Sequence, residues 1–271
     1  NESLMVEMVT EASSPISAAE RKRRDLAWPT LDANDPALRG VVENPMSDLL
    51  RLIRQSDPRL RELLVTDNTG KLVAATGRTS DYDQADEAWW RRAFADGERG
   101  RLFVSPVRYD ESSEVWSVDL CVPLHDRGRL VGVGKAVLDL GRWIGSETRD
   151  VGQYGASLML VREDGQVLFR RGTRPLSIPV EPLIGRRIRG ADGQWWQAPG
   201  EEIQAAHRVR LPSRSLGLPL VSPSWYVVLY MPQAGPLGAV NRLALATVGV
   251  GLVLVAIIFV AGLFLVDRSI G

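Results

Sequence analysis

The stretch LLVTDNTGKLVAATG (63–77) decides the fold of this chain. It contains an apolar run, a turn rich in Asp, Asn and Gly, and a second apolar run, which is typical of a β-hairpin in which Gly70 takes a positive φ. The stretch LMLVREDGQVLFRRG (158–172) repeats the pattern, and in both copies the turn glycine, Gly70 or Gly165, lies seven residues before the closing glycine. A hairpin repeated in this way predicts two related modules in tandem.

Further strands and one short helix are predicted around the two hairpins. The segment AWWRRAFADG (88–97) is expected to form an amphipathic helix, because Asp86 and Glu87 lie where negative charge favours a helix N-terminus. Apolar or alternating segments predict strands at 101–105, 114–124, 128–140, 194–197, 201–211 and 225–231. Helices that flank antiparallel hairpins, without strict alternation of strand and helix, indicate the α+β class.

Residues 1–60 are predicted to form a long N-terminal helical stalk with breaks. The segment SAAERKRRDLAW (17–28) is rich in good helix formers. Prolines at positions 15, 29, 36, 45 and 58 prevent one uninterrupted rod. We interpret the basic run ERKRR (20–24) as a solvated helix face rather than a nucleic-acid patch.

The segment LALATVGVGLVLVAIIFVAGLFLV (243–266) has 24 residues without a charge, and Thr247 carries its one side chain able to hydrogen-bond. A helix of this length spans about 36 Å, enough to cross a bilayer. A buried core helix is the alternative, but such helices are usually shorter and interrupted. Arg242 and Asp267 bracket the run as interfacial anchors do. We therefore predict a transmembrane helix within 239–266 and the start of a cytoplasmic region at 267–271.

The sequence begins at Asn1 and stops five residues after the predicted span. We therefore expect a piece of a longer protein, with an aqueous region, a membrane helix and a further part beyond it. The span lies at the C-terminal end with no cleavage pattern after it, which is unlike a signal peptide. Single arginines on its two sides, Arg242 and Arg268, leave its orientation undetermined by charge.

Composition and charge exclude several classes of function. Lys and Arg total 33, as do Asp and Glu, and this zero net charge excludes a general nucleic-acid binder. Cys121 is the single cysteine, which excludes a disulfide framework and a Cys-rich zinc site, and the two histidines supply few metal ligands. The stretch GVGKA (132–136) lacks the spacing of a nucleotide loop, and no nucleophile motif accompanies His207. We predict no catalytic residues, no metal and no cofactor.

The order of elements resembles the double Cache (dCache) family, which comprises tandem PAS-like sensor modules of bacterial transmembrane receptors. Members often carry a Tyr, four residues, an Arg, one residue and then Trp-Tyr at the start of the membrane-distal pocket helix. Tyr82 and Trp89 match this motif, whereas Glu87 replaces the Arg and Trp90 replaces the Tyr. The terminal Asp of the family's distal strand is matched by Asp139. In the amino-acid-binding subset, the Arg holds the ligand carboxylate and the Asp holds its ammonium.

Glu87 changes the ligand that the resemblance implies, because a carboxylate repels the carboxylate that an Arg would bind. Positive charge could instead come from Arg91, Arg92 or Arg108. Aromatic faces together with carboxylates favour a cationic or amine ligand held by cation–π contacts, or a small polar molecule stacked on tryptophan. As alternatives, the two tryptophans are core residues and Asp139 caps the helix that follows. The candidate ligand-binding residues are Tyr82, Glu87, Trp89, Trp90, Arg108, Tyr109, Asp119 and Asp139.

The resemblance implies a stalk at 1–60, a membrane-distal module at 61–150, a membrane-proximal module at 151–238 and the membrane helix. It also implies an extracytoplasmic sensor in the inner membrane that binds a small molecule in the distal module. Such receptors commonly dimerise through the N-terminal helix and signal to an output domain of the same polypeptide: a kinase, cyclase, phosphatase or chemoreceptor module. A membrane-anchored envelope enzyme and a structural or adhesive ectodomain without ligand are the alternatives.

Overall fold

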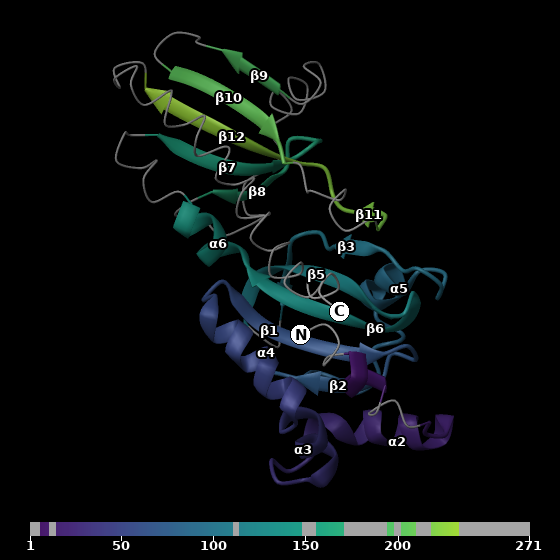
Figure 1. Cartoon of the computed structure of the whole chain (residues 1–271). Helices are drawn as coiled ribbons and strands as arrows, with labels where there is room; N and C mark the ends of the chain where they lie inside the picture. Colours follow the sequence, from purple (N-terminus) through teal and green to yellow (C-terminus); the bar gives the residue numbers. More distant parts are fainter. Residues whose placement is uncertain are drawn as a thin grey trace, which may run out of the picture. The chain divides into compact units, whose positions relative to one another are not determined.

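The computed structural model describes residues 6–10, 15–110, 114–147, 156–170, 194–197, 202–209 and 218–232. Described residues up to Asp139, together with 218–222, form one compact unit, and those from Leu140 to 209 with 223–232 form a second (Figure 1). None of the helices in these ranges is long and apolar enough to span a membrane. The predicted span at 239–266 and the residues after it lie outside the described residues, and the predicted domain boundaries stay predictions.

The N-terminal part of the first unit is helical and consists of several short helices, so the predicted breaks are confirmed and the stalk is not one long helix. Residues 15–60 contain the α-helices α2 (Ala18–Ala27), α3 (Pro36–Val42) and α4 (Pro45–Ser56), and the 3-10 helix η1 (Trp28–Thr30). Both α3 and α4 begin with proline, which lacks the N–H that an interior helical position must donate. The side chains of Ser17, Asp35 and Asn44 cap the three α-helices by accepting a backbone N–H. Pro36 and Pro45 therefore each start a new helix.

The first unit contains a twisted antiparallel sheet that confirms the strands predicted for this region. Its strands are β1 (Leu60–Asp67), β2 (Leu72–Ala75), β3 (Leu102–Val104), β4 (Arg108–Asp110), β5 (Val115–Asp126) and β6 (Arg129–Asp139). They follow the order β3-β5-β6-β1-β2, and β4 also pairs with β5. The short strand β11 (Leu220–Val221) adds to this sheet parallel to β3. The sequence did not predict β4 or β11.

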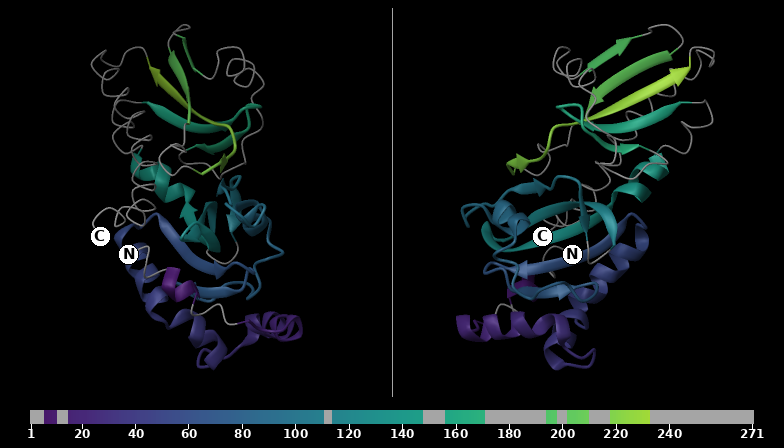
Figure 2. Two further views of the ribbon diagram at one scale, coloured as in Figure 1. Left: turned by 45° about the vertical axis from the view of Figure 1, so that its right-hand side comes forward. Right: turned by 180° about the vertical axis from the view of Figure 1, so that it is seen from behind.

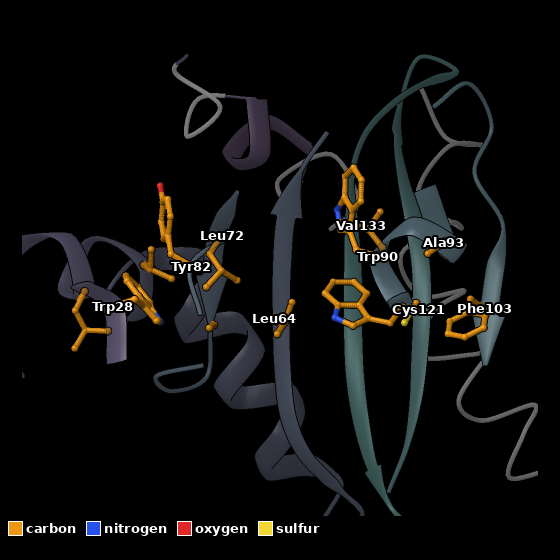
Figure 3. Packing of buried hydrophobic residues seen from close by; sticks show 13 residues of the cluster. Trp28, Leu64, Leu72, Tyr82, Trp90, Ala93, Phe103, Cys121 and Val133 are labelled. Carbon is orange, nitrogen blue, oxygen red and sulfur yellow. The ribbon is translucent and has the colours of Figure 1, made fainter. Parts of the chain in front are cut away.

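Helices cover both faces of this sheet. Side chains along β1 alternate between the two faces, so β1 contributes apolar side chains to both. The helix α5 (Ala88–Phe94) packs against β3, β5 and β6, while α3 and α4 pack at β1 and β2 (Figures 1 and 2). Leu63 and Val65 form one apolar cluster with Met46 and Leu50 of α4. The opposite face holds the larger cluster shown in Figure 3, which includes Trp28, Leu64, Leu72, Tyr82, Trp89, Trp90, Phe103, Cys121 and Val133.

The hairpin turn between β1 and β2 takes its shape from two residues. The carboxylate oxygen Oδ1 of Asp67 accepts the backbone N–H groups of Thr69, at 2.8 Å, and of Lys71, at 3.1 Å. Gly70 adopts a φ of 89°, and an added Cβ atom would lie 2.6 Å from the Cβ atom of Ala85. Glycine is therefore required both by the backbone and by the close approach of the loop before α5.

The second unit repeats this hairpin. Its strands are β7 (Ser157–Arg162), β8 (Val167–Arg170), β9 (Gln194–Gln197), β10 (Glu202–Arg208) and β12 (Trp225–Pro232), in the antiparallel order β8-β7-β12-β10-β9, preceded by α6 (Leu140–Glu147). Gly165 has a φ of 93°, and the N–H of Gly165 donates to the carbonyl of Arg162 as Gly70 donates to Asp67. A register shift follows Leu160 in β7, as it follows Val65 in β1. The predicted hairpin repeat is confirmed at the level of individual hydrogen bonds.

Candidate functional site

Two strands of the first unit place a buried carboxylate beside an arginine. Arg108 of β4 lies opposite Ser117 of β5, and Asp119 is two residues further along β5, so the three side chains share one face of the sheet. The guanidinium of Arg108 donates to Oδ2 of Asp119 from Nε, at 3.2 Å, and from Nη2, at 2.9 Å. Its Nη2 atom also lies 3.1 Å from Oδ2 of Asp110. Asp119 is 1% exposed and Arg108 is 43% exposed, so the pair extends from the interior to the surface.

The geometry leaves two polar atoms of this face without a hydrogen bond. The other carboxylate oxygen of Asp119, Oδ1, and the hydroxyl oxygen of Ser117 are both buried and have no hydrogen-bond partner among the described residues. Ser117 is fully buried, and Asp139 lies opposite it on β6. Buried polar atoms are nearly always hydrogen-bonded, and leaving one unpaired costs about 1–3 kcal/mol. A ligand that donated a hydrogen bond here would remove that cost.

Trp89 of α5 lies over a lysine of the same sheet face. The ammonium of Lys135 is 5.1 Å from the centroid of the Trp89 ring and 4.0 Å from Oδ2 of Asp119. Lys135 lies opposite Cys121 on β5 and is only 8% exposed. An ammonium removed from water in this way is stabilised by the aromatic face and by the carboxylate.

Glu87 immediately precedes α5 and is half-buried. Burial of the guanidinium acts to lower the pKa of Arg108, but the charge and hydrogen bond of Asp119, with the charges of Asp110 and Glu87, outweigh it and raise that pKa. Burial and the charge of Glu87 likewise raise the pKa of Asp81. The negative charge of Glu87 thus contributes to the raised pKa of both groups.

We call these residues, which share a sheet face or act on its charged groups, the Asp119 cluster: Glu87, Trp89, Arg108, Asp110, Ser117, Asp119, Lys135 and Asp139. It contains four carboxylates and two cations. An additional positive charge is therefore favoured over a negative one.

Trp90 and Tyr82, two further predicted site residues, have packing roles in the core. The indole N–H of Trp90 donates to the hydroxyl oxygen of Thr66 at 2.9 Å, and its ring stacks on Phe94 with 4.3 Å between centroids. The ring of Tyr82 lies 5.2 Å from that of Trp28 and 5.9 Å from the guanidinium carbon of Arg24. Figure 3 shows Tyr82 beside Trp28 and away from Trp90. Their ligand contacts remain predictions.

Tyr109 stands apart from the Asp119 cluster. Its side chain is 46% exposed, and its ring meets the edge of Trp116 with 5.7 Å between centroids. Neighbouring residues of a strand point to opposite faces, so Tyr109 faces away from the side that Arg108 occupies. A ligand contact of Tyr109 therefore also remains a prediction.

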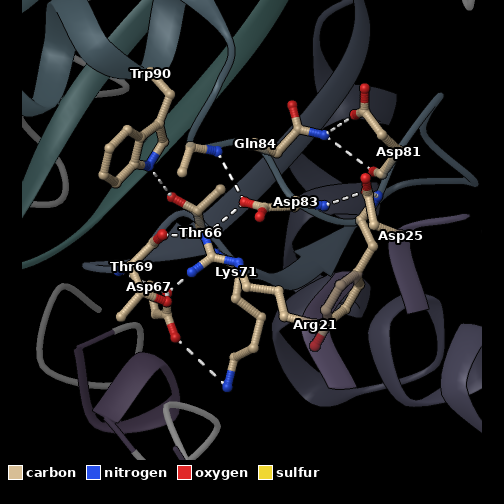
Figure 4. A network of polar contacts seen from close by, with 12 residues as sticks. Arg21, Asp25, Thr66, Asp67, Thr69, Lys71, Asp81, Asp83, Gln84 and Trp90 are labelled. Atoms are coloured by element: carbon tan, nitrogen blue, oxygen red, sulfur yellow. Dashed lines mark hydrogen bonds and ion pairs between the residues drawn. The ribbon is translucent and has the colours of Figure 1, made fainter. Parts of the chain in front are cut away.

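A polar network ties α2 to the segment that leads into α5 (Figure 4). Arg21 donates to Oδ1 of Asp83 at 2.5 Å and also to the carbonyl oxygen of Thr69. The indole N–H of Trp28 donates to the hydroxyl oxygen of Thr79 at 3.1 Å. The position of α5, and with it of Trp89, thus depends on contacts with the N-terminal helices.

The sequence alone did not identify three members of the cluster, Asp110, Ser117 and Lys135. Alternation along the predicted strand at 128–140 could have identified Lys135, because Lys135 shares a sheet face with Val133 and Val137. Of the three arginines considered as a source of positive charge, Arg108 belongs to the cluster, whereas Arg91 and Arg92 are exposed on α5. Within the described ranges, His, Cys, Asp and Glu side chains form no group of three or more suited to a metal ion.

Comparisons with known proteins identify the fold. No family model matches the sequence, and no curated protein matches it. An extracellular ligand-binding receptor from Desulfohalobium retbaense is 12% identical, with a TM-score of 0.54; the match covers 83% of this chain and 39% of that one. The extracellular domain of a protein described as a histidine kinase, rpHK1S-Z16, is 16% identical, with a TM-score of 0.50 and coverage of 73% and 82%. The chain has the fold of these extracellular domains.

A further solved structure, the sensory domain of the Campylobacter jejuni chemoreceptor Tlp3, is 12% identical over 86% of this chain and 93% of that one, with a TM-score of 0.48. The first two of these structures carry the assignment, and they are consistent with the dCache fold predicted from the order of elements. In this fold, the described part of the first unit carries α5 and the Asp119 cluster on one face of its sheet.

Proposed function

We propose that this chain is the extracytoplasmic ligand-sensing region of a bacterial transmembrane receptor in the inner membrane. Its ligand is a small molecule, and its site is the Asp119 cluster of the first unit, which is the membrane-distal module in the resemblance. The observation that carries this proposal is the pair of buried, unpaired polar atoms, Oδ1 of Asp119 and Oγ of Ser117. They lie next to Arg108, whose side chain is 43% exposed.

The ligand class follows from the chemistry of these two atoms. A carboxylate oxygen only accepts hydrogen bonds, so the ligand must present an N–H or O–H group to Asp119. The excess of carboxylates in the cluster favours a positive charge on that group. Arg108 and Lys135 already pair with Asp119, and Arg108 also pairs with Asp110. An amine without a carboxylate therefore fits better than a zwitterionic amino acid.

Signalling requires that the ligand bind two arrangements of the receptor with different affinity. The contacts between α2 and the segment before α5 can link the ligand site to the N-terminal helices. A ligand that contacts Trp89 and Glu87 acts on this same segment. From the resemblance, we expect the change to pass through the membrane helix at 239–266 to a cytoplasmic output domain of the same polypeptide, within a homodimer.

A ligand screen on the full 271-residue chain in detergent micelles tests the proposal. Amines, amino acids and carboxylates are screened by thermal shift, and hits are measured by calorimetry. A ligand present at a hundred times its Kd adds about 2.7 kcal/mol of stability, which raises Tm by several degrees. We expect amines to give the largest shifts.

The variant Asp119→Asn is expected to weaken binding by at least about tenfold, because it loses the negative charge that an ammonium pairs with. The matched control is Asp48→Asn, since Asp48 is 70% exposed and lies on α4. Equal affinity of Asp119→Asn and the wild type would refute the site. No response to any compound would favour a structural or adhesive ectodomain, and turnover of a screened compound would favour an envelope enzyme.

A further inference from the structure

The ammonium of Lys135 lies where a ligand cation would lie if it bound to the aromatic face of Trp89. Its ammonium lies 5.1 Å from the centroid of the Trp89 ring, within the range of a cation–π contact. The same ammonium is 4.0 Å from Oδ2 of Asp119, the oxygen that also accepts from Arg108. Trp89 and Oδ2 are thus both occupied by cations of the protein.

The free hydrogen-bonding capacity of the cluster lies elsewhere. It is at Oδ1 of Asp119 and at the hydroxyl of Ser117, which are both buried and have no partner in the described part of the chain. A primary ammonium has N–H donors for both atoms, whereas a quaternary ammonium has none. A quaternary ammonium also depends on an aromatic face, and here Lys135 covers the face of Trp89.

We propose that Lys135 is a specificity-determining residue. By occupying Trp89 and one oxygen of Asp119, it restricts the site to ligands with an N–H-bearing ammonium. It disfavours quaternary ammonium groups and ligands that carry a second positive charge. This inference rests on the proposed function. It differs from the sequence-based expectation, in which the ligand cation itself lies on tryptophan. In the structure a tethered cation takes that place.

The wild-type protein gives the first test. Calorimetry on the full chain in detergent micelles compares n-butylamine with butyltrimethylammonium, which share a chain length and a charge. We expect n-butylamine to bind at least about tenfold more tightly, because only it can donate to Asp119. Equal or tighter binding of the quaternary compound would overturn the proposal.

The variant Lys135→Met gives the second test, because methionine keeps much of the length of lysine without its charge. We expect its affinity for butyltrimethylammonium and for 1,4-diaminobutane to rise, relative to n-butylamine, by about tenfold. Lys135→Arg keeps the charge and should retain the wild-type preferences. Lys22→Met is the matched control, since Lys22 is exposed on α2.

The outcomes separate this inference from the proposed function. Wild-type affinity ratios in a folded Lys135→Met variant would overturn the role of Lys135 alone. If that variant does not fold, equal or tighter binding of butyltrimethylammonium by the wild type would still overturn the proposal. A protein that binds neither amine but responds to another compound in the ligand screen would overturn this inference and leave the sensing function standing. A protein that responds to no compound would overturn both.

Discussion

The carboxylate oxygen Oδ1 of Asp25 accepts the backbone N–H of Tyr82 at 2.9 Å, across 57 residues of sequence. The same oxygen accepts the N–H of Asp83 at 2.8 Å. One side chain of α2 thereby satisfies two consecutive backbone donors in the segment that leads into α5. We expect Asp25→Ala to lower the free energy of unfolding by about 1–3 kcal/mol, because both donors lose their acceptor. Urea unfolding of the full chain in detergent micelles measures this.

Asp25→Asn separates hydrogen bonding from charge. Its amide oxygen can still accept both N–H groups, so we expect a loss of about 1 kcal/mol or less. The control Asp48→Ala removes an exposed carboxylate that pairs with Arg51, a contact worth about 0–1 kcal/mol. A loss with Asp25→Asn as large as that with Asp25→Ala would show that charge, and not the acceptor, holds the contact.

Gly70 is expected to tolerate alanine much less well than Gly128 does. Both residues have a positive φ, 89° and 82°, so both substitutions cost about 1–2 kcal/mol in backbone strain. At Gly70 the new Cβ atom also overlaps Ala85, whereas nothing lies within 4 Å of the corresponding position at Gly128. We expect Gly70→Ala to lose about 1–3 kcal/mol more than Gly128→Ala in urea unfolding. Equal losses would mean that the loop at Ala85 shifts at no cost.

The same turn explains why the hairpins could be predicted from the sequence. An acidic residue, a glycine and two apolar runs specify a hairpin locally, and Gly70 and Gly165 adopt nearly the same φ. The strands β4 and β11 contain three and two residues, too few for a periodic pattern. The pairing of β11 with β3 joins segments more than a hundred residues apart, which no local pattern encodes.

The candidate site was predictable only in part, for a related reason. Asp119, Asp139 and Trp89 were proposed from strand alternation and from the resemblance, and they belong to the Asp119 cluster. The role of Lys135 depends on the register that sets it opposite Cys121 and on the position of α5 above it. Register and helix placement are tertiary properties, so the sequence suggested a ligand cation on Trp89 where the structure has Lys135.

The hydrogen bond between Trp90 and Thr66 is expected to stabilise the position of α5. Its length is 2.9 Å, and both side chains are buried. A double-mutant cycle with Trp90→Phe and Thr66→Val isolates the interaction from the lost volume. We expect a coupling energy of about 1 kcal/mol in urea unfolding, a typical value for a neutral hydrogen bond. A coupling energy near zero would show that apolar packing alone positions Trp90.

Cys121 is expected to be unreactive in the folded chain, even in mild alkali. It is buried, and burial, followed by the negative charge of Asp119, raises its pKa well above the usual value for a thiol. Iodoacetamide attacks the thiolate, whose fraction in an unfolded chain rises near a pH of about 8.5. Labelling followed by mass spectrometry should be at least about a hundredfold slower in the folded chain than in guanidinium chloride. Comparable rates would contradict the burial of Cys121.

The same raised pKa predicts the direction in which stability depends on pH. Above about pH 8.5 the unfolded thiol loses its proton while the folded thiol keeps it, so the folded state binds more protons and stability falls as pH rises. Below that pH both states are protonated and the thiol adds no dependence. Urea unfolding of Cys121→Ala should therefore show a weaker decline above about pH 8.5 than the wild type, by up to about 1.4 kcal/mol per pH unit. Because other groups titrate in both proteins, the difference between the two curves isolates Cys121, and a difference independent of pH would contradict the shift.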